Sequence, residues 1–229
     1  MPNRIHRAMK RTKKGITGML MSVLFLFSAC VFSSCSGTAD SDEEALAVIA
    51  PKDELAIAPS KEKLPGTVIQ NEDFASRHDE DECFNITPDF IADNSDFTVI
   101  KFNKTTSSFI IYEGNIYSIG TCFGGYGITS MALADINMDN QYELYYTFSW
   151  GSGIHRSQIG YFDPVSKEVT VFDYAFWNGD MMLTVNESGD LCVDRAALSI
   201  DSFVDFTVKA KERIGTIVFD EGEIKLHGG

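Results

Sequence analysis

The second half of the chain alternates short runs of β-branched and aromatic residues with turn-forming residues, and this pattern limits the fold more than any other feature. Turn signals separate most of the runs, as at Asp163-Pro164 and Asn178-Gly179-Asp180. Short strands joined by tight turns are typical of antiparallel sheets. The predicted strands are Phe97–Phe102, Ser108–Tyr112, Asn115–Ile119, Ser130–Ala134, Glu143–Trp150, Gln158–Phe162, Glu168–Tyr174, Met181–Val185, Leu191–Asp194, Phe203–Val208, Gly215–Phe219 and Glu223–Leu226.

The predicted fold class is all-β, either an antiparallel β-sandwich or a partial propeller-like domain, after a disordered N-terminal tether. We expect the all-β domain to cover residues 90–229, which is enough chain for one ordinary core. The aromatic residues of the predicted strands are expected to be buried rather than to form a carbohydrate platform.

One interval between predicted strands carries oxygen-bearing side chains at alternate positions. These residues are Asp135, Asn137, Asp139, Gln141 and Glu143. In a calcium loop, positions 1, 3 and 5 offer side chains, position 7 offers its backbone carbonyl, and an acid closes the shell. Asn140 stands where a sharp turn usually needs glycine, and Asn is the next best residue for a left-handed conformation. An EF-hand is excluded, because its twelfth position here is Tyr146 and the flanks read as strands.

A strand, an Asp-x-Asn-x-Asp-x-x-x-Glu loop and a second aromatic-rich strand resemble the calcium-binding loops of FG-GAP and VCBS-type repeats, familiar from integrin-like β-propellers. The resemblance covers the loop and its flanks, and it implies that these five residues bind Ca²⁺. The motif occurs once, whereas a propeller repeats its blade several times, so a full propeller is not expected. The alternative is an Asx-rich turn that caps its own backbone without a metal.

The N-terminal region has the pattern of a secretory signal. Residues 1–14 hold six Lys or Arg and no acid, and an apolar run from Gly18 to Phe32 follows that is too short for a comfortable membrane span. The run ends in Phe32-Ser33-Ser34-Cys35, which resembles a bacterial lipobox. The resemblance implies a signal peptide at residues 1–34, a lipidated Cys35 and an extracytoplasmic, membrane-anchored protein of a bacterium.

Two alternatives to lipidation at Cys35 stay open. The stretch ending at Cys30 fits the lipobox nearly as well, and a plain secretory signal would be cut near Ala29 or Ser34. After the signal, residues 35–66 are predicted to be a flexible spacer, because they alternate prolines, alanines and charges without an aromatic residue. Residues 67–89 form an acidic lead-in to the domain.

Charge limits the partners of the mature protein. The full chain has 19 basic and 33 acidic residues, and removing a signal with six basic residues leaves 13 against 33, a net charge of −20. Such a field repels nucleic acid and anionic lipid headgroups and favours cations. Beyond Cys30 and Cys35, the three remaining cysteines, Cys83, Cys122 and Cys192, cannot all pair within one chain.

A compact polar stretch follows the calcium-like loop, and we expect it to form a hairpin between strands. Its candidate ligand-binding residues are Trp150, Ser152, His155 and Arg156. The aromatic ring of Trp150 beside such polar groups is suited to binding a sugar, a peptide carboxylate or another small anionic group. The alternative is that Trp150 packs in the core and His155 caps a backbone carbonyl.

A catalytic alternative begins at Gly120-Thr121-Cys122-Phe123-Gly124, which has the spacing of a hydrolase nucleophile elbow with cysteine as nucleophile. His155 would be the base, and an acid such as Asp135 would orient it. The elbow needs a strand that enters a helix, and the glycines that follow are a poor helix start.

The sequence thus predicts a surface lipoprotein, tethered to the membrane through its lipid anchor. Its calcium-stabilised all-β domain is expected to act as a non-catalytic binding or adhesion module for a carbohydrate or protein ligand. The alternative is an extracytoplasmic thiol hydrolase that uses Cys122 and His155.

Overall fold

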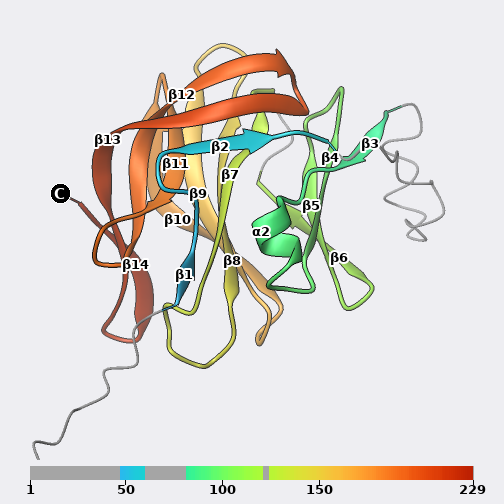
Figure 1. The fold of residues 1–229 in the computed structure, drawn as a ribbon. Coiled ribbons are helices and arrows are strands. Elements are labelled where there is room, and N and C mark those ends of the chain that lie inside the picture. The colour runs from blue at the N-terminus through green and yellow to red at the C-terminus, as the bar shows by residue number, and fades with distance from the viewer. Residues whose placement is uncertain (1–46, 60–80, 121–123, 229) are drawn as a thin grey trace, which may run out of the picture. The chain divides into compact units, whose positions relative to one another are not determined.

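The computed structural model describes residues 47–59, 81–120 and 124–228, all within the compact unit Glu43–Gly229 (Figure 1). Their regular secondary structure is nearly all strand, and the helical element within these ranges is the short α2, Asp89–Ala92. The strands pair antiparallel in three sheets, so the predicted all-β, antiparallel fold is confirmed for the described residues. Within this part of the chain, no helix has the length and apolar character needed to cross a membrane.

Sheet A has the strand order β1-β7-β8-β9-β10. Its strands are β1 Val48–Ile49, β7 Gly127–Ala134, β8 Glu143–Trp150, β9 Arg156–Asp163 and β10 Glu168–Trp177. Every residue of β7 is buried, and so is every residue of β8 except Trp150. Both faces of these two strands are therefore covered, which accounts for their nearly continuous runs of apolar and hydroxyl side chains.

Sheet B has the order β11-β12-β13-β14, and β2 pairs with β13 beside them. Its strands are β2 Glu54–Ile57, β11 Asp180–Val185, β12 Leu191–Ser202, β13 Asp205–Asp220 and β14 Glu223–Gly228. β13 covers most of the predicted strand Phe203–Val208 and all of the predicted strand Gly215–Phe219 in one continuous strand. β12 continues beyond Asp194, where the predicted strand ends. The β12–β13 pairing contains register shifts, and such bulges let long strands bend without breaking.

Sheet C is a four-stranded meander in the order β3-β4-β5-β6. Its strands are β3 Cys83–Asn85, β4 Thr98–Phe102, β5 Ser108–Tyr112 and β6 Asn115–Ile119. Val99 and Ile110 on one face join the main core, whereas Ile100, Phe102 and Phe109 form a small separate cluster on the other. Alternate residues thus serve two different apolar clusters, as the period of a strand requires.

The main hydrophobic core draws residues from all three sheets. Phe162 of β9 lies against Phe97, Tyr112 and Tyr117, with ring centroids 5.8, 5.7 and 4.7 Å away. Met182 and Phe206 of sheet B are buried in the same cluster. All three sheets therefore contribute to this cluster, and sheets A and B share a second buried cluster.

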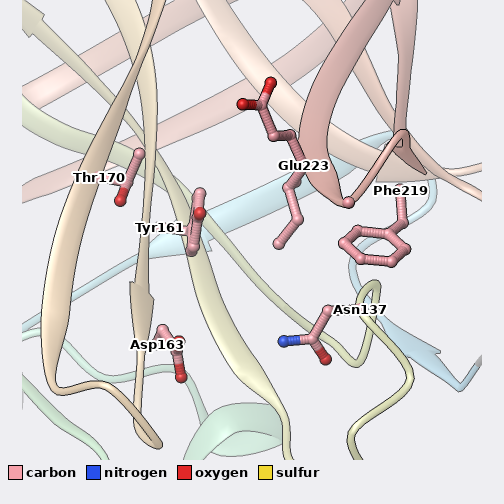
Figure 2. Close-up of a pocket in the computed structure, with 8 residues that line it drawn as sticks. Asn137, Tyr161, Asp163, Thr170, Phe219 and Glu223 are labelled. Carbon is pink, nitrogen blue, oxygen red and sulfur yellow. The ribbon is translucent and has the colours of Figure 1, made fainter.

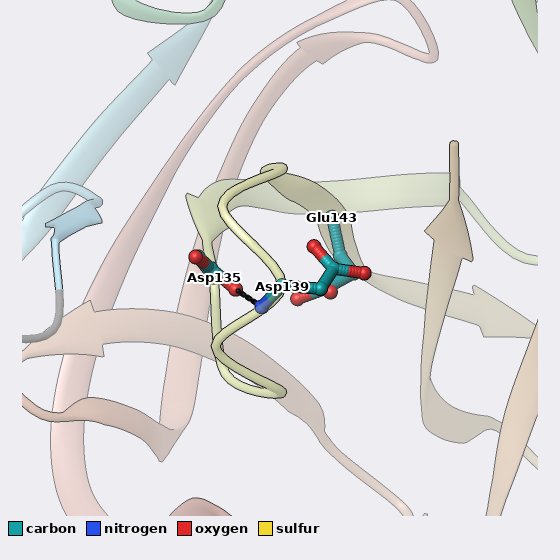
Figure 3. A group of neighbouring side chains, drawn as sticks. All are labelled: Asp135, Asp139 and Glu143. Carbon is teal, nitrogen blue, oxygen red and sulfur yellow. Dashed lines mark hydrogen bonds between the residues drawn. The ribbon is translucent and has the colours of Figure 1, made fainter. Parts of the chain in front are cut away.

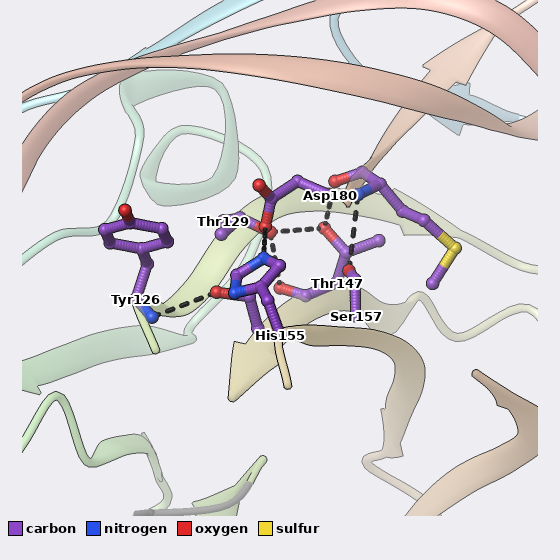
Figure 4. Close-up of polar contacts among 8 residues, drawn as sticks. Tyr126, Thr129, Thr147, His155, Ser157 and Asp180 are labelled. Atoms are coloured by element: carbon purple, nitrogen blue, oxygen red, sulfur yellow. Dashed lines mark hydrogen bonds and ion pairs between the residues drawn. The ribbon is translucent and has the colours of Figure 1, made fainter. Parts of the chain in front are cut away.

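The open edge of β11 is closed by hydroxyl groups of sheet A. The Met181 N–H donates to Ser157 Oγ at 3.3 Å, and the Met181 carbonyl accepts from Thr147 Oγ1 at 3.0 Å (Figure 4). The Leu183 N–H donates to Ser130 Oγ at 2.8 Å. Unpaired backbone groups at a sheet edge invite pairing with other chains, and here small side chains of the neighbouring sheet satisfy them.

The structure corrects the predicted domain boundaries. β1 and β2 come from the predicted spacer, residues 35–66, and β3 comes from the predicted lead-in, residues 67–89. Leu55 and Ile57 are only 7% and 1% exposed, while Glu54 and Ala56 between them are exposed. This two-residue alternation is a strand signal that the surrounding prolines and alanines obscured. The signal peptide and Cys35 lie outside the described residues.

Candidate functional site

The predicted calcium loop joins β7 to β8 at one end of sheet A. Ala134 and Glu143 are paired residues across this hairpin. Met138 and Asn140 have positive φ values of 59° and 66°, so Asn140 adopts the left-handed conformation that its position requires. The loop thereby turns back within a few residues and brings its first and last acids together.

Three carboxylates gather in this loop. Asp135, Asp139 and Glu143 each offer an oxygen, and the three oxygens lie within 4.8 Å of one another (Figure 3). The carboxylate of Asp135 accepts the backbone N–H groups of Asp139 and Asn140 at 3.0 and 2.8 Å. Like charges at such distances repel one another, so the arrangement favours a cation between them.

The other two predicted ligands also belong to this network. Asn137 Oδ1 accepts the backbone N–H of Asp139 at 3.0 Å, and Asn137 Nδ2 donates to Asp139 Oδ2 at 3.1 Å. The backbone N–H of Gln141 donates to Asp139 Oδ1 at 2.9 Å. These backbone bonds hold the loop in a turn.

Glu143 differs from the other two acids because it is fully buried. Its Oε2 accepts the backbone N–H of Ile136 at 3.1 Å and the hydroxyl of Tyr145 at 3.0 Å. Its Oε1 is enclosed and has no hydrogen-bond partner among the described residues. Burial raises the pKa of Glu143 to about 7, although both hydrogen bonds act in the opposite direction. A buried carboxylate oxygen without a partner is costly, and a cation would satisfy it.

The donor set fits a hard cation. Carboxylate, amide and backbone carbonyl oxygens are the ligands that Ca²⁺ prefers, and its coordination tolerates an irregular loop better than that of Mg²⁺ does. The enclosed oxygen of Glu143 is the observation that separates this loop from an ordinary Asx-rich turn, because a turn uses exposed acids to cap backbone groups.

A groove opens beside the loop (Figure 2). It encloses about 420 Å³ and is lined by Asn137, Tyr161, Asp163, Thr170, Phe219, Gly222, Glu223 and Ile224. Asn137 comes from the loop, and the others come from β9, β10 and the β13–β14 hairpin. No sequence pattern indicated this groove, because strands far apart in the chain build its walls.

The structure brings together two of the four predicted ligand-binding residues. Trp150 and Arg156 are paired residues of β8 and β9, and the guanidinium carbon of Arg156 lies 4.7 Å from the Trp150 ring centroid. On its other side Arg156 pairs with Trp177 of β10, whose ring centroid is 4.1 Å away. Ser152 lies exposed in the connecting turn. Trp177 was not a predicted site residue, since only the strand register reveals it.

The fourth predicted residue, His155, has a different neighbour. Its Nε2 lies 2.7 Å from Asp180 Oδ1, and its ring packs against Tyr126 (Figure 4). Burial raises the pKa of Asp180, while the contacts with His155 and Ser149 lower it. The His155–Asp180 pair ties the turn after β8 to the start of β11, which is a structural role that the sequence did not suggest.

The catalytic alternative gains no support from the described residues. Cys122 lies outside them. The chain that follows from Gly124 leads into strand β7, whereas a nucleophile elbow needs a helix there. The acid beside His155 is Asp180 and not Asp135. Cys83 and Cys192 are free and buried.

Comparison of this chain with protein-family models, with curated proteins and with solved structures finds no match.

Proposed function

We propose that this protein is an extracytoplasmic, lipid-anchored binding module whose β-domain is stabilised by one Ca²⁺ ion. The ion would be held by side-chain oxygens of Asp135, Asn137, Asp139 and Glu143 and by the backbone carbonyl of Gln141. The observation that carries the proposal is the enclosed Oε1 of Glu143, unpartnered within the described part of the chain, beside two further carboxylates.

The electrostatics of the loop support a structural role for the ion. A fully buried carboxylate is unfavourable in its charged form, and the raised pKa of Glu143 reflects this cost. A divalent cation would compensate the three clustered charges and give Oε1 a ligand. The free energy of binding would then add to the stability of the folded state, because the unfolded chain holds no such cluster.

The proposed calcium loop also forms part of the wall of the neighbouring groove. Asn137 belongs both to the proposed coordination shell and to the wall of the neighbouring groove. The acidic residues Asp163 and Glu223 and the aromatic Tyr161 line the same groove. A groove of this composition suits a neutral or cationic ligand with hydroxyl groups, and the ion would fix the orientation of one of its walls.

The proposed location rests on the sequence. A basic segment, an apolar run and Cys35 precede the domain, and the chain after Cys35 is strongly acidic. Under this proposal the lipid on Cys35 holds the protein at the membrane and the domain extends from it. The expected role is attachment to a ligand at the cell surface rather than catalysis.

Thermal unfolding of residues 36–229, here named the secreted chain, tests the role of the ion. With free calcium at about 100 times its dissociation constant, the melting temperature should exceed that in chelator by about 5–10 °C. Asp139→Ala should abolish the difference, whereas Asp173→Asn, at an exposed acid of β10, should leave it unchanged. Superimposed melting curves of the unmodified chain would refute the calcium proposal.

A further inference from the structure

Two tryptophans and one arginine form a continuous stack across three neighbouring strands, which we name the Trp-Arg-Trp ladder. Trp150 of β8, Arg156 of β9 and Trp177 of β10 are register partners. The guanidinium lies between the two indole rings, 4.7 and 4.1 Å from their centroids. A hydrogen bond of 2.8 Å from Trp150 Nε1 to Gln158 Oε1 fixes one of the rings.

Arg156 has no carboxylate partner among the described residues, although the chain is rich in acids. The other two arginines in the described part of the chain are paired, Arg195 with Glu212 at 3.0 Å and Arg213 with Asp194 at 2.5 Å. The Nε of Arg156 is enclosed and makes no hydrogen bond within the same ranges. The indole faces stabilise the cation but accept no conventional hydrogen bond from its N–H groups.

The stacking decides how a partner can approach. Because an indole ring lies on each side of the guanidinium carbon and Nε is enclosed, a partner has most access to the edge formed by the terminal nitrogens. A carboxylate meets that edge with two parallel hydrogen bonds. Because Nε is enclosed and the rings exclude water from the faces, such a pair would be stronger than one at an open surface.

The surroundings favour an apolar body on the same ligand. Trp177 is 53% exposed, and Ile154 in the adjacent turn is 52% exposed. A ligand whose carboxylate lies on Arg156 can cover part of the Trp177 ring with an aromatic or aliphatic group, which would remove apolar surface from water.

Net charge selects a carboxylate over a phosphate. The chain after Cys35 carries a net charge of −20, and this field opposes a dianion more than a monoanion. The same field opposes a monoanion about half as strongly, because the Coulomb energy is proportional to the charge of the ligand.

We propose that the Trp-Arg-Trp ladder binds the carboxylate of a ligand that has an apolar body, such as the free carboxyl end of a peptide with an aromatic last residue. This inference rests on the binding role proposed above but not on the metal ion. It assigns a ligand class to a second surface, since none of the three ladder residues lines the groove beside Asn137, and it adds Trp177 to the candidate binding residues.

The chain offers a direct readout, because Trp150 and Trp177 are its two tryptophans. We would titrate the secreted chain with N-acetylphenylalanine, with its amide and with inorganic phosphate, and follow tryptophan fluorescence. We expect a saturable change with the carboxylate, at a dissociation constant on the order of 1 mM for so small a probe, and a much weaker response to the amide and to phosphate.

Two variants test the assignment to Arg156. Arg156→Lys keeps the charge but removes the planar pair of donors, and it should weaken binding by about tenfold. Arg195→Lys is the matched control, because Arg195 also lies over an aromatic ring but has its own carboxylate partner. Binding of the carboxylate should be unchanged in this variant, and melting curves would verify that both variants fold.

Equal responses to acid and amide, stronger binding of phosphate, or unchanged affinity in Arg156→Lys would overturn the proposal. The titrations would be run both in calcium and in chelator. A normal calcium effect on melting without carboxylate binding rejects the ladder alone. Carboxylate binding to a chain whose melting ignores calcium rejects the metal site alone.

Discussion

The backbone N–H of Ile136 donates to Oε2 of Glu143 at 3.1 Å, so the last acid of the loop bonds to its second residue. This contact holds the buried carboxylate in place while its Oε1 has no partner among the described residues. The loop's own backbone therefore fixes the orientation of its closing acid, and a bound ion would compensate the three clustered charges and give Oε1 a ligand.

Replacing Glu143 by glutamine should change stability in opposite directions with and without calcium. The amide of the Glu143→Gln variant would keep an oxygen acceptor but carry no charge, so this variant should equal or exceed the unmodified chain in chelator. In calcium it should melt lower, because an amide oxygen is a weaker ligand for a hard cation. Thermal unfolding in both conditions is the measurement. A loss of the same size in both would show that Glu143 acts without a metal.

Lys101 should make stability depend on pH in the alkaline range. Its side chain is fully buried, its Nζ has no hydrogen-bond partner in the described ranges, and it lies 4.7 Å from the Phe206 ring centroid. Burial lowers the pKa of Lys101 from 10.5 to about 7. Between these values the unfolded chain binds more protons than the folded chain, so the free energy of unfolding should rise as the pH increases from 7 toward 10.

The variant Lys101→Met isolates this effect. Methionine fills the same space without a charge. We therefore expect the variant to raise the free energy of unfolding at pH 7 by a few kcal/mol, the order of magnitude that corresponds to the lowered pKa of Lys101. Denaturant unfolding at several pH values in calcium would measure it. The expectation fails if the variant retains the full slope of the unmodified chain above pH 7.

Ser130→Ala should destabilise the protein although it removes only one oxygen atom. Ser130 Oγ accepts the N–H of Leu183 at 2.8 Å, and both residues are buried. A buried N–H left without a partner costs about 1–3 kcal/mol. Ser118→Ala, on the exposed side of β6, is the matched control and should be nearly neutral. Equal stability of the two variants in denaturant unfolding would show that water replaces the lost acceptor.

Deleting residues 36–59 should damage the domain, whereas deleting residues 36–46 should not. The longer deletion removes β1 and β2, exposes the edges of β7 and β13 and leaves a cavity at Leu55 and Ile57. We expect lower melting temperatures and aggregation, which light scattering would detect. If the two deletions behave alike, the β1 and β2 pairings contribute little to the domain.

Much of the fold could be predicted because strand periodicity and turn residues are local signals. Three predicted strands, Ser108–Tyr112, Asn115–Ile119 and Glu143–Trp150, have the observed bounds. The ends of β12 and β13 were missed because bulges let both strands continue through polar stretches. β2 was missed because its alternation covers only four residues among prolines and charges.

In the candidate sites, too, residues supplied by one local segment could be predicted, whereas contacts between distant segments could not. Asp135, Asp139 and Glu143 could be identified because a single loop supplies all of them. The burial of Glu143 could not, since it depends on packing around Tyr145 and Ile136. The contacts of Trp177 with Arg156 and of Asp180 with His155 could not be predicted either. They follow from the order and register of the strands, which no local sequence pattern indicates. Nor could the groove beside Asn137 be predicted, because β9, β10 and the β13–β14 hairpin build most of its wall.

The most direct test of the account is a calorimetric titration of calcium into the secreted chain. We predict one Ca²⁺ ion per chain, strongly weakened binding in Glu143→Gln and unchanged binding in Asp173→Asn. Absence of binding up to about 10 mM calcium, a range that reaches the weakest extracellular calcium sites, would contradict the account. Equal binding by the Glu143→Gln variant would contradict it as well.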